Sequence, residues 1–254
     1  MKEEEILLLC MRAGALLLQY GGETSRVEQT IRHLAIGAGM DAHQIQSFVT
    51  PTGIFVSMST PNGSITKLHR MVGQTTLNLD KVSAVNDLSR RFERQQCSID
   101  DALQELDRIE KAAPLYSAWI CRLAAFVSSG SFTLFFGGHG LDFISGGVAG
   151  LLSELVMEWL ADYVPGFLAV LLASLAASLL AAVISVVTKS TTEGAIVIGA
   201  VIPLLPGMSV TNSIRDLLAG DLLSGVARGA EALFISGAIA VAVALALDLS
   251  AHFY

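Results

Sequence analysis

The chain has 254 residues, of which 52% are hydrophobic and 15% charged, and its formal net charge is −7. This acidic balance, with no concentrated basic stretch, argues against nucleic acid as a partner. The cysteines and histidines show neither a metal-ligand spacing nor an H-E-x-x-H pair, so we expect no metal and no other cofactor.

Residues 1–114 are predicted to form a cytoplasmic α+β domain. Two helices are expected first, then three β-rich stretches and two polar helices, which in chain order cover 4–20, 25–38, 44–50, 53–59, 64–70, 81–95 and 99–112. Gly21-Gly22 is typical of a helix C-cap, and Ser25 with Glu28 fits a capping box for the second helix. Asn62-Gly63 indicates a hairpin turn, and Ser98 is expected to cap the last helix.

Residues 115–254 are predicted to form an all-α membrane domain of five transmembrane helices. Five apolar stretches have about the length that crosses a bilayer, at 116–136, 141–161, 167–187, 194–214 and 229–249. Their connections are short, so neighbouring spans should run antiparallel. Basic residues lie before the first span and in the fourth connection, whereas the loops on the opposite side have only Lys189. The positive-inside rule then places the N-terminus in the cytoplasm and the C-terminus outside the inner membrane.

The fourth apolar stretch is predicted to be broken at Pro203–Gly207. Pro203 and Pro206 each remove a backbone donor, and Gly207 favours unwinding. In hydrocarbon, freed backbone groups persist only where protein or a water-filled cavity satisfies them, so a broken span points to a transport path. The alternative is a proline kink of purely structural use.

Polar residues follow this break. A half-helix that resumes near Met208 would direct its N–H groups and the positive end of its dipole at the break, where a carboxylate could bind. Ser209, Thr211 and Asn212 lie on this segment and could cap the half-helix or touch the substrate. For Ser209 we favour capping over direct contact.

Charged residues in the membrane half have two interpretations. Arg122 in the first span should reach the depth of Glu154 and Glu158, which are one helical turn apart in the second span. A structural ion pair is the plainer interpretation, and a proton-coupling glutamate is the alternative. Asp216 and Arg228 lie toward the expected cytoplasmic mouth, where a loop-bracing salt bridge is favoured over substrate contact.

Two segments together resemble a known family. Residues 17–28, Leu-Leu-Gln-Tyr-Gly-Gly-Glu-Thr-Ser-Arg-Val-Glu, are similar to the amino-terminal signature of the threonine/serine exporter (ThrE) family, and within it to the stand-alone YjjP-type component. The second match is the family's Pro-Gly membrane segment with the loop after it, which here consists of Pro206, Gly207, Asn212, Asp216, Gly220, Gly225 and Arg228.

The resemblance implies a function and a partner. It implies export of small metabolites, either amino acids such as threonine and serine or dicarboxylates such as succinate. It also implies a separate five-span YjjB-type membrane subunit, so the chain would be half of a two-component exporter. An odd number of spans independently leaves no internal mate for paired halves, and a homo-oligomer is the other way to supply one.

The signature residues of the N-terminal domain are Gly21, Gly22, Glu23, Arg26 and Glu28. The plainer interpretation is a helix end followed by a surface Arg26–Glu28 pair. The sharper hypothesis is a gate or metabolite sensor beneath the inner mouth of the transport path.

Other protein classes fit less well. The sequence contains no G-x-S-x-G, Walker A or dinucleotide-binding motif, so neither an enzyme nor direct ATP-driven transport is expected. The remaining alternatives are a membrane-anchored sensor or assembly scaffold and, less favoured, a membrane hydrolase.

Overall fold

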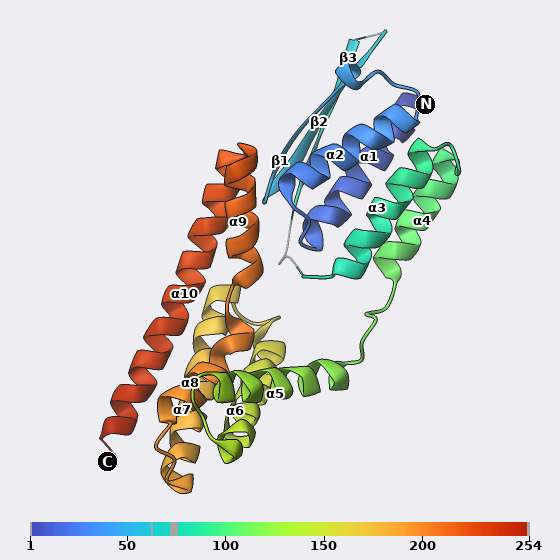
Figure 1. Cartoon of the computed structure of the whole chain (residues 1–254). Helices are drawn as coiled ribbons and strands as arrows, with labels where there is room; N and C mark the ends of the chain where they lie inside the picture. Colours follow the sequence, from blue (N-terminus) through green and yellow to red (C-terminus); the bar gives the residue numbers. More distant parts are fainter. Residues whose placement is uncertain (1, 62, 72–75, 253–254) are drawn as a thin grey trace. The chain divides into compact units, whose positions relative to one another are not determined.

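The computed structural model describes residues 2–61, 63–71 and 76–252. Within these residues the chain forms ten α-helices, two short 3-10 helices and one three-stranded sheet (Figure 1). In chain order the elements are α1 (Lys2–Gln19), α2 (Thr24–Gly37), η1 (Ala42–Gln44), β1 (Ile45–Thr50), β2 (Gly53–Thr60), β3 (Gly63–Arg70), α3 (Leu79–Glu93), α4 (Ile99–Lys111), α5 (Ala118–Phe135), α6 (Gly140–Leu160), α7 (Gly166–Thr188), α8 (Glu193–Val201), η2 (Ile202–Leu204), α9 (Gly207–Ala219) and α10 (Leu222–Ala251).

The chain divides into two compact units. Unit 1 contains Met1–Leu115 together with Val210–Gly229, and unit 2 contains Tyr116–Ser209 together with Ala230–Tyr254. The end of α9 and the start of α10 therefore belong to the same unit as the N-terminal residues.

Unit 1 is built in layers. β1, β2 and β3 form an antiparallel sheet in that order, with Phe48 opposite Phe55 and Ile54 opposite His69. α1 and α2 pack on the sheet, and α3 and α4 pack on the other side of these helices (Figure 1). Since α1 is covered on both sides, it is apolar around most of its circumference, and residues such as Leu7 and Leu17 are fully buried.

The predicted elements of this region are confirmed with one error. The three β-rich stretches are β1, β2 and β3, and Ser98 accepts a hydrogen bond from the N–H of Asp101 at the start of α4. The Ser25–Glu28 capping box is wrong, because α2 begins at Thr24 and Ser25 is its second residue. Part of the expected Asn62-Gly63 turn lies outside the described residues, since Asn62 is not among them.

Unit 2 is a bundle of apolar helices held together by small residues. α5, α6, α7 and α8 contact one another. Gly146 and Gly199 lie so close to Thr133 that an added Cβ would sit 1.9 and 2.0 Å from its Oγ1. Small residues at such positions let helix backbones approach closely. The small face of α7 is also covered from within the chain, since Ala173 and Ala177 are fully buried.

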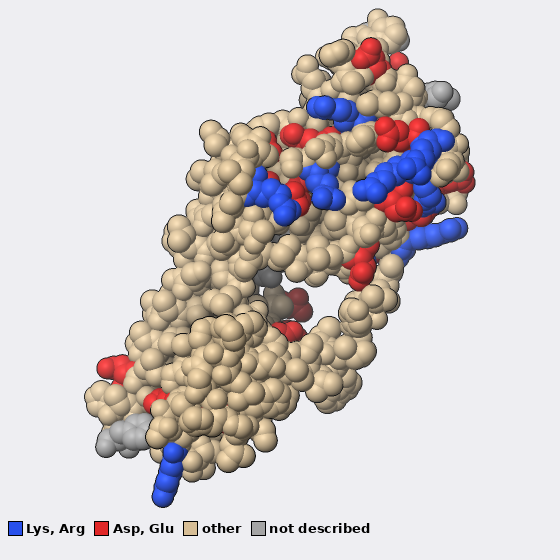
Figure 2. All heavy atoms as spheres, in the orientation of Figure 1, with Lys and Arg blue, Asp and Glu red and all other residues tan. Residues whose placement is uncertain are grey.

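Several of these helices are candidate membrane spans. Among the described residues, α5, α6, α7 and α10 are long and apolar enough to cross a membrane, and α8 with η2 and α9 adds a fifth if this interrupted pair counts as one span. On the face shown in Figure 2, Lys, Arg, Asp and Glu crowd the surface formed by α1–α4, whereas the surface of α5–α8 is almost free of them. The fold thus contains four to five candidate spans and, in addition, a charged α+β region.

Candidate functional site

The signature glycines form a tight turn between α1 and α2. Gly21 has a φ of +91°, and its N–H donates to the carbonyl of Leu18 (3.3 Å) while the N–H of Gly22 donates to that of Leu17 (2.7 Å). This is a Schellman motif, in which glycine supplies the left-handed residue. A Cβ on Gly22 would lie only 2.7 Å from the Leu17 oxygen. Both glycines are therefore required by the backbone itself.

A second turn of the same kind joins α9 to α10. Gly220 also has a φ of +91°, and the N–H groups of Gly220 and Asp221 donate to the carbonyls of Leu217 (3.1 Å) and Asp216 (2.9 Å). After the turn, a Cβ on Gly225 would lie 2.6 Å from Leu217 Cγ, so α10 runs closely along α9. Gly220 and Gly225 of the second family segment thus build a tight helical corner.

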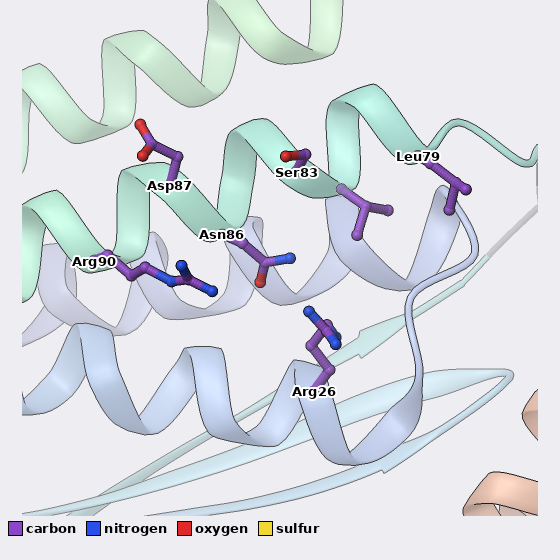
Figure 3. A pocket seen from close by; sticks show the side chains of 7 residues that line it. Arg26, Leu79, Ser83, Asn86, Asp87 and Arg90 are labelled. Carbon is purple, nitrogen blue, oxygen red and sulfur yellow. The ribbon is translucent and has the colours of Figure 1, made fainter.

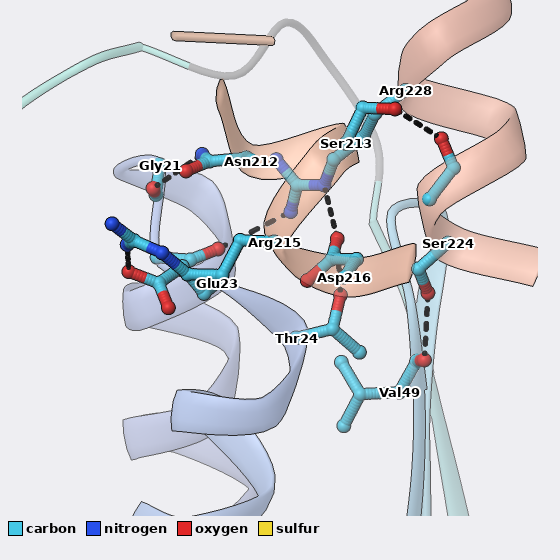
Figure 4. Close-up of polar contacts among 12 residues, drawn as sticks. Gly21, Glu23, Thr24, Val49, Asn212, Ser213, Arg215, Asp216, Ser224 and Arg228 are labelled. Atoms are coloured by element: carbon cyan, nitrogen blue, oxygen red, sulfur yellow. Dashed lines mark hydrogen bonds and ion pairs between the residues drawn. The ribbon is translucent and has the colours of Figure 1, made fainter. Parts of the chain in front are cut away.

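The two turns contact each other within unit 1. Asn212 Nδ2 donates to the Gly21 carbonyl (3.4 Å), and Arg228 Nη2 donates to the Gly22 carbonyl (3.2 Å) (Figure 4). The hydroxyl of Thr24 donates to Asp216 Oδ2 (3.3 Å). We call this group of residues the signature cluster; its members are Gly21, Gly22, Glu23, Thr24, Asn212, Arg215, Asp216 and Arg228. The signature cluster thus brings together residues from the two segments that resemble the threonine/serine exporter family, 17–28 and 206–228.

An ion pair lies at the centre of the signature cluster. Arg228 Nε is 3.3 Å from Asp216 Oδ2, and the two residues are 8% and 0% exposed. Asn212 beside them is 4% exposed. A buried pair of this kind contributes less to net stability than its Coulomb attraction suggests, but removing one partner leaves an uncompensated charge. The predicted salt bridge between Asp216 and Arg228 is therefore present, and it braces the α9–α10 corner against the Gly21-Gly22 turn.

Two further contacts flank this pair. Arg215 forms an ion pair with Glu23 on the outer side of the cluster, where the Arg215 side chain is half-exposed. On the other side, Ser224 of α10 donates to the carbonyl of Val49 in β1 (3.3 Å) (Figure 4). The N-terminal segment, the sheet and the α9–α10 corner are thus joined at one place.

Glu28 joins the sheet rather than pairing with Arg26. Its Oε1 accepts a hydrogen bond from the N–H of Val49 (3.2 Å). Burial raises the pKa of Glu28; the hydrogen bond from Val49 lowers it, the charge of Asp221 raises it further, and Arg32 opposes this. The net direction is a raised pKa, so the ionised form of Glu28 is disfavoured in the folded protein.

The predicted interruption of the fourth apolar stretch is present. α8 ends at Val201, Pro203 lies in η2, and α9 begins at Gly207 directly after Pro206. Ser209 is the third residue of α9 and lies inside its first turn, so Pro206 rather than Ser209 precedes the helix. Thr211 follows on the exposed side of α9. Asn212 is directed into the signature cluster instead of toward the break.

The charged residues of unit 2 also have definite partners. Arg122 donates through Nη2 to Glu158 Oε2 (2.7 Å) and lies over the ring of Trp119. Glu154, one turn away on α6, makes no such hydrogen bond among the described residues. The structure therefore selects Glu158 as the partner of Arg122.

One buried acid had no role assigned from the sequence. Asp142 is 4% exposed and accepts hydrogen bonds from the N–H of His139 (2.7 Å) and from the hydroxyls of Ser190 (2.9 Å) and Thr192 (2.6 Å). It ties the start of α6 to the loop between α7 and α8. The three-residue spacing from His139 to Asp142 is the sequence signal that could have indicated a helix-capping acid.

The family described as "Putative threonine/serine exporter", ThrE, matches residues 8–250. The chain belongs to this family. Together with the apolar helices, membership of the threonine/serine exporter family identifies a multi-pass membrane protein.

Its similarity to individual family members is low. An uncharacterised protein of Schizosaccharomyces pombe, C7D4.12c, is 26% identical over 96% of this chain and 33% of its own length. A probable threonine/serine exporter of Mycobacterium tuberculosis is 23% identical over 96% of this chain and 46% of its own length. The chain thus spans a third to a half of these two relatives. The probable succinate transporter subunit YjjP of Klebsiella aerogenes is 22% identical over 98% of this chain and 95% of its own length. No solved structure matches the chain.

Proposed function

We propose that this chain is one subunit of an exporter of small carboxylate-bearing metabolites, either amino acids such as threonine and serine or dicarboxylates such as succinate. The observation that carries the proposal is the helix interruption at Pro203–Gly207 in an otherwise apolar segment. A helix that starts within a membrane offers its N-terminal N–H groups and the positive end of its dipole to an anion. The names of the two bacterial relatives support the same substrate classes.

The transport path in this proposal contains Pro203, Pro206, Gly207, Ser209 and Thr211. Asn212 has a different role from the other polar residues, since it holds the continuing part of α9 to the Gly21 carbonyl. Because α9 is one helix of about 1.5 Å rise per residue, Gly207 and Asp216 are roughly 14 Å apart along it. A movement of the signature cluster would therefore be transmitted along α9 to the break, which makes Asp216 and Arg228 gating residues rather than substrate ligands.

The remaining parts of the proposal concern topology and assembly. We propose that residues 1–114 are cytoplasmic, that residues 115–254 form the membrane domain, and that the C-terminus lies outside. Arg215, Asp216 and Arg228 would then lie at the cytoplasmic end of the membrane domain. The second subunit would be a five-span YjjB-type protein, in agreement with the word "subunit" in the name of the Klebsiella aerogenes relative.

The test uses the full chain in proteoliposomes, alone and together with the candidate partner. Efflux of radiolabelled threonine, serine and succinate is measured per inserted protein. We expect little efflux from the chain alone, efflux with the partner, and loss of most of it in Pro206→Ala/Gly207→Leu, which restores a backbone donor and helix propensity. Gly237→Leu is the matched control, since Gly237 of α10 faces open space.

Three results would contradict parts of the proposal. Full efflux from the single chain would exclude a required partner and favour a homo-oligomer. Normal efflux from the straightened variant would place the transport path elsewhere. If no substrate moves although both subunits are inserted, the sensor or scaffold interpretation would replace the exporter.

A further inference from the structure

The surface of unit 1 contains a hollow of about 280 Å³ between α2 and α3. The two helices run in parallel here, since Thr30 lies beside Asn86 and Gly37 packs against Glu93. The hollow lies over the N-terminal part of α2 and along most of α3, and Leu79 and Val82 of α3 form its apolar end. It is separate from the signature cluster and from the helix interruption.

Three nitrogen-bearing side chains converge on this hollow. Asn86 and Arg90 are one turn apart on α3, and Arg26 reaches toward them from α2 (Figure 3). The hydroxyl of Thr30 lies 3.4 Å from Asn86 Oδ1, which leaves the amino group of Asn86 as a donor toward the hollow. The arrangement offers two guanidinium groups and one amide to a ligand.

The charges of these arginines are not neutralised by neighbouring acids. Among the described residues, neither Arg26 nor Arg90 takes part in an ion pair. Asp87, the acid among the lining residues, is engaged through Oδ2 by Arg91 Nε at 2.9 Å rather than by Arg26 or Arg90. The hollow therefore offers two guanidinium groups that have no ion-pair partner among the described residues.

This chemistry selects among small anions. A guanidinium binds a carboxylate through two parallel hydrogen bonds, so two guanidiniums suit a ligand with two carboxylates. A zwitterionic amino acid offers only one carboxylate to the two guanidinium groups and brings its ammonium group close to them, so it should bind more weakly. A nucleotide would need a surface on which to stack its base, and no aromatic side chain lines the hollow. The apolar end formed by Leu79 and Val82 fits a short carbon chain.

We propose that the hollow between α2 and α3 is a binding site for a small dicarboxylate, held by Arg26, Asn86 and Arg90. Binding of a dicarboxylate at this site does not depend on the proposed function. A role of the site in sensing the exported substrate would rest on it. Arg26, a residue of the family signature, is exposed and lines this hollow. Bound dicarboxylate would bridge α2 to α3 and stiffen the helix that begins directly after the signature glycines.

The test measures hydrogen exchange of the full chain in lipid nanodiscs, with rates determined for individual peptides. Succinate, threonine or inorganic phosphate is added at matched ionic strength. We expect succinate to slow exchange in residues 24–37 and 79–93, and threonine and phosphate to need concentrations about tenfold higher or more. Arg26→Gln/Arg90→Gln should abolish the effect. Arg32→Gln/Arg94→Gln, with the same charge change at exposed positions of the same region, should preserve it.

The outcomes separate this site from the transport path. The absence of any succinate effect, or an effect that survives Arg26→Gln/Arg90→Gln, would overturn the site. Equal potency of phosphate would overturn its selectivity for dicarboxylates. Slowed exchange in α2 and α3 without measurable efflux would support the binding site and contradict the exporter. Efflux without slowed exchange would support the exporter and contradict the binding site.

Discussion

Arg228 donates a hydrogen bond to the backbone carbonyl of Gly22, a residue 206 positions earlier in the chain. The same arginine is paired with Asp216, so one buried side chain joins α10, α9 and the turn between α1 and α2. The two family segments, which lie at opposite ends of the sequence, are thus parts of one structural element.

This relationship predicts a large cost for losing either charge. Arg228→Met leaves Asp216 buried and unpaired and should destabilise unit 1 by about 3–5 kcal/mol. The double variant Asp216→Leu/Arg228→Met should recover a substantial part of that loss. Exchange rates of the amides of residues 21–24 measure the opening free energy. Arg215→Gln is the control, since a half-exposed pair should contribute at most about 1 kcal/mol; equal costs for both arginines would contradict the assigned burial.

Two glycines of unit 1, Gly39 after α2 and the signature residue Gly22, should separate the cost of a left-handed conformation from the cost of a steric clash. Gly39→Ala introduces a side chain at a φ of +88° in open space and should cost about 1 kcal/mol. Gly22→Ala places its Cβ 2.7 Å from the Leu17 oxygen, a backbone atom that has little room to move, and should cost more. Thermal unfolding of the two variants in detergent tests the order, and a milder effect at Gly22 would contradict the turn described above.

The raised pKa of Glu28 predicts a defined pH dependence. A carboxyl whose pKa is higher in the folded protein contributes stability that is fully present below the unfolded pKa, near 4.5, and is lost as pH rises through the folded value. Glu28→Gln keeps a side-chain oxygen that can accept the hydrogen bond from the Val49 N–H. Because glutamine does not ionise, the variant does not lose this stability as pH rises. The variant should therefore gain stability relative to the wild type as pH rises above about 4.5. Melting temperatures across pH 4–7 test this; a constant difference would contradict the assigned direction.

The helix contacts of unit 2 predict which glycines tolerate a methyl group. Gly199→Ala would place a carbon 2.0 Å from Thr133 Oγ1 and 2.7 Å from the Ser129 carbonyl, so α8 could not keep its distance from α5. Gly237→Ala meets nothing within 4 Å and should be neutral or slightly stabilising because alanine favours helix. The yield of monodisperse, membrane-inserted protein measures the difference. Similar yields for both variants would show that the α5–α8 contact is looser than described.

The Arg122–Glu158 pair allows the two interpretations of the intramembrane charges to be separated. If the pair is structural, Arg122→Gln, Glu158→Gln and the double variant should lose similar amounts of efflux. If a glutamate couples protons, Glu154→Gln or Glu158→Gln should flatten the pH dependence of efflux, which Arg122→Gln would leave in place. The pH profile of efflux from proteoliposomes decides between them.

Local signals were enough to locate most elements. The β-rich stretches, the Ser98 cap and the Pro203–Gly207 interruption are short-range features, since glycine, proline and capping residues act within a few positions. The capping box at Ser25 failed because α2 starts directly after Glu23, which puts the N-cap two residues before Ser25. Helix ends are the part of a prediction that such small shifts affect most.

Long-range packing could not be predicted from the sequence. The expected place of Asp216 and Arg228 at the cytoplasmic mouth predicted their salt bridge but not its burial against the Gly22 carbonyl, because nothing local relates these residues to the N-terminal segment. For the same reason, Asn212 was expected near the helix break and instead contacts Gly21. The network of Asp142 with Ser190 and Thr192 also depends on which loops meet in space.

The discontinuity of unit 1 has a consequence for the order in which the protein is made. When the ribosome has completed Leu115, the carbonyls of Gly21 and Gly22 still lack the donors on Asn212 and Arg228. Those donors emerge only after all of Tyr116–Ser209 has been synthesised. The N-terminal region can therefore reach its final packing only after the segment that follows it has been translated. Closure of the Gly22–Arg228 hydrogen bond is thus a late step that reports completed assembly of the chain.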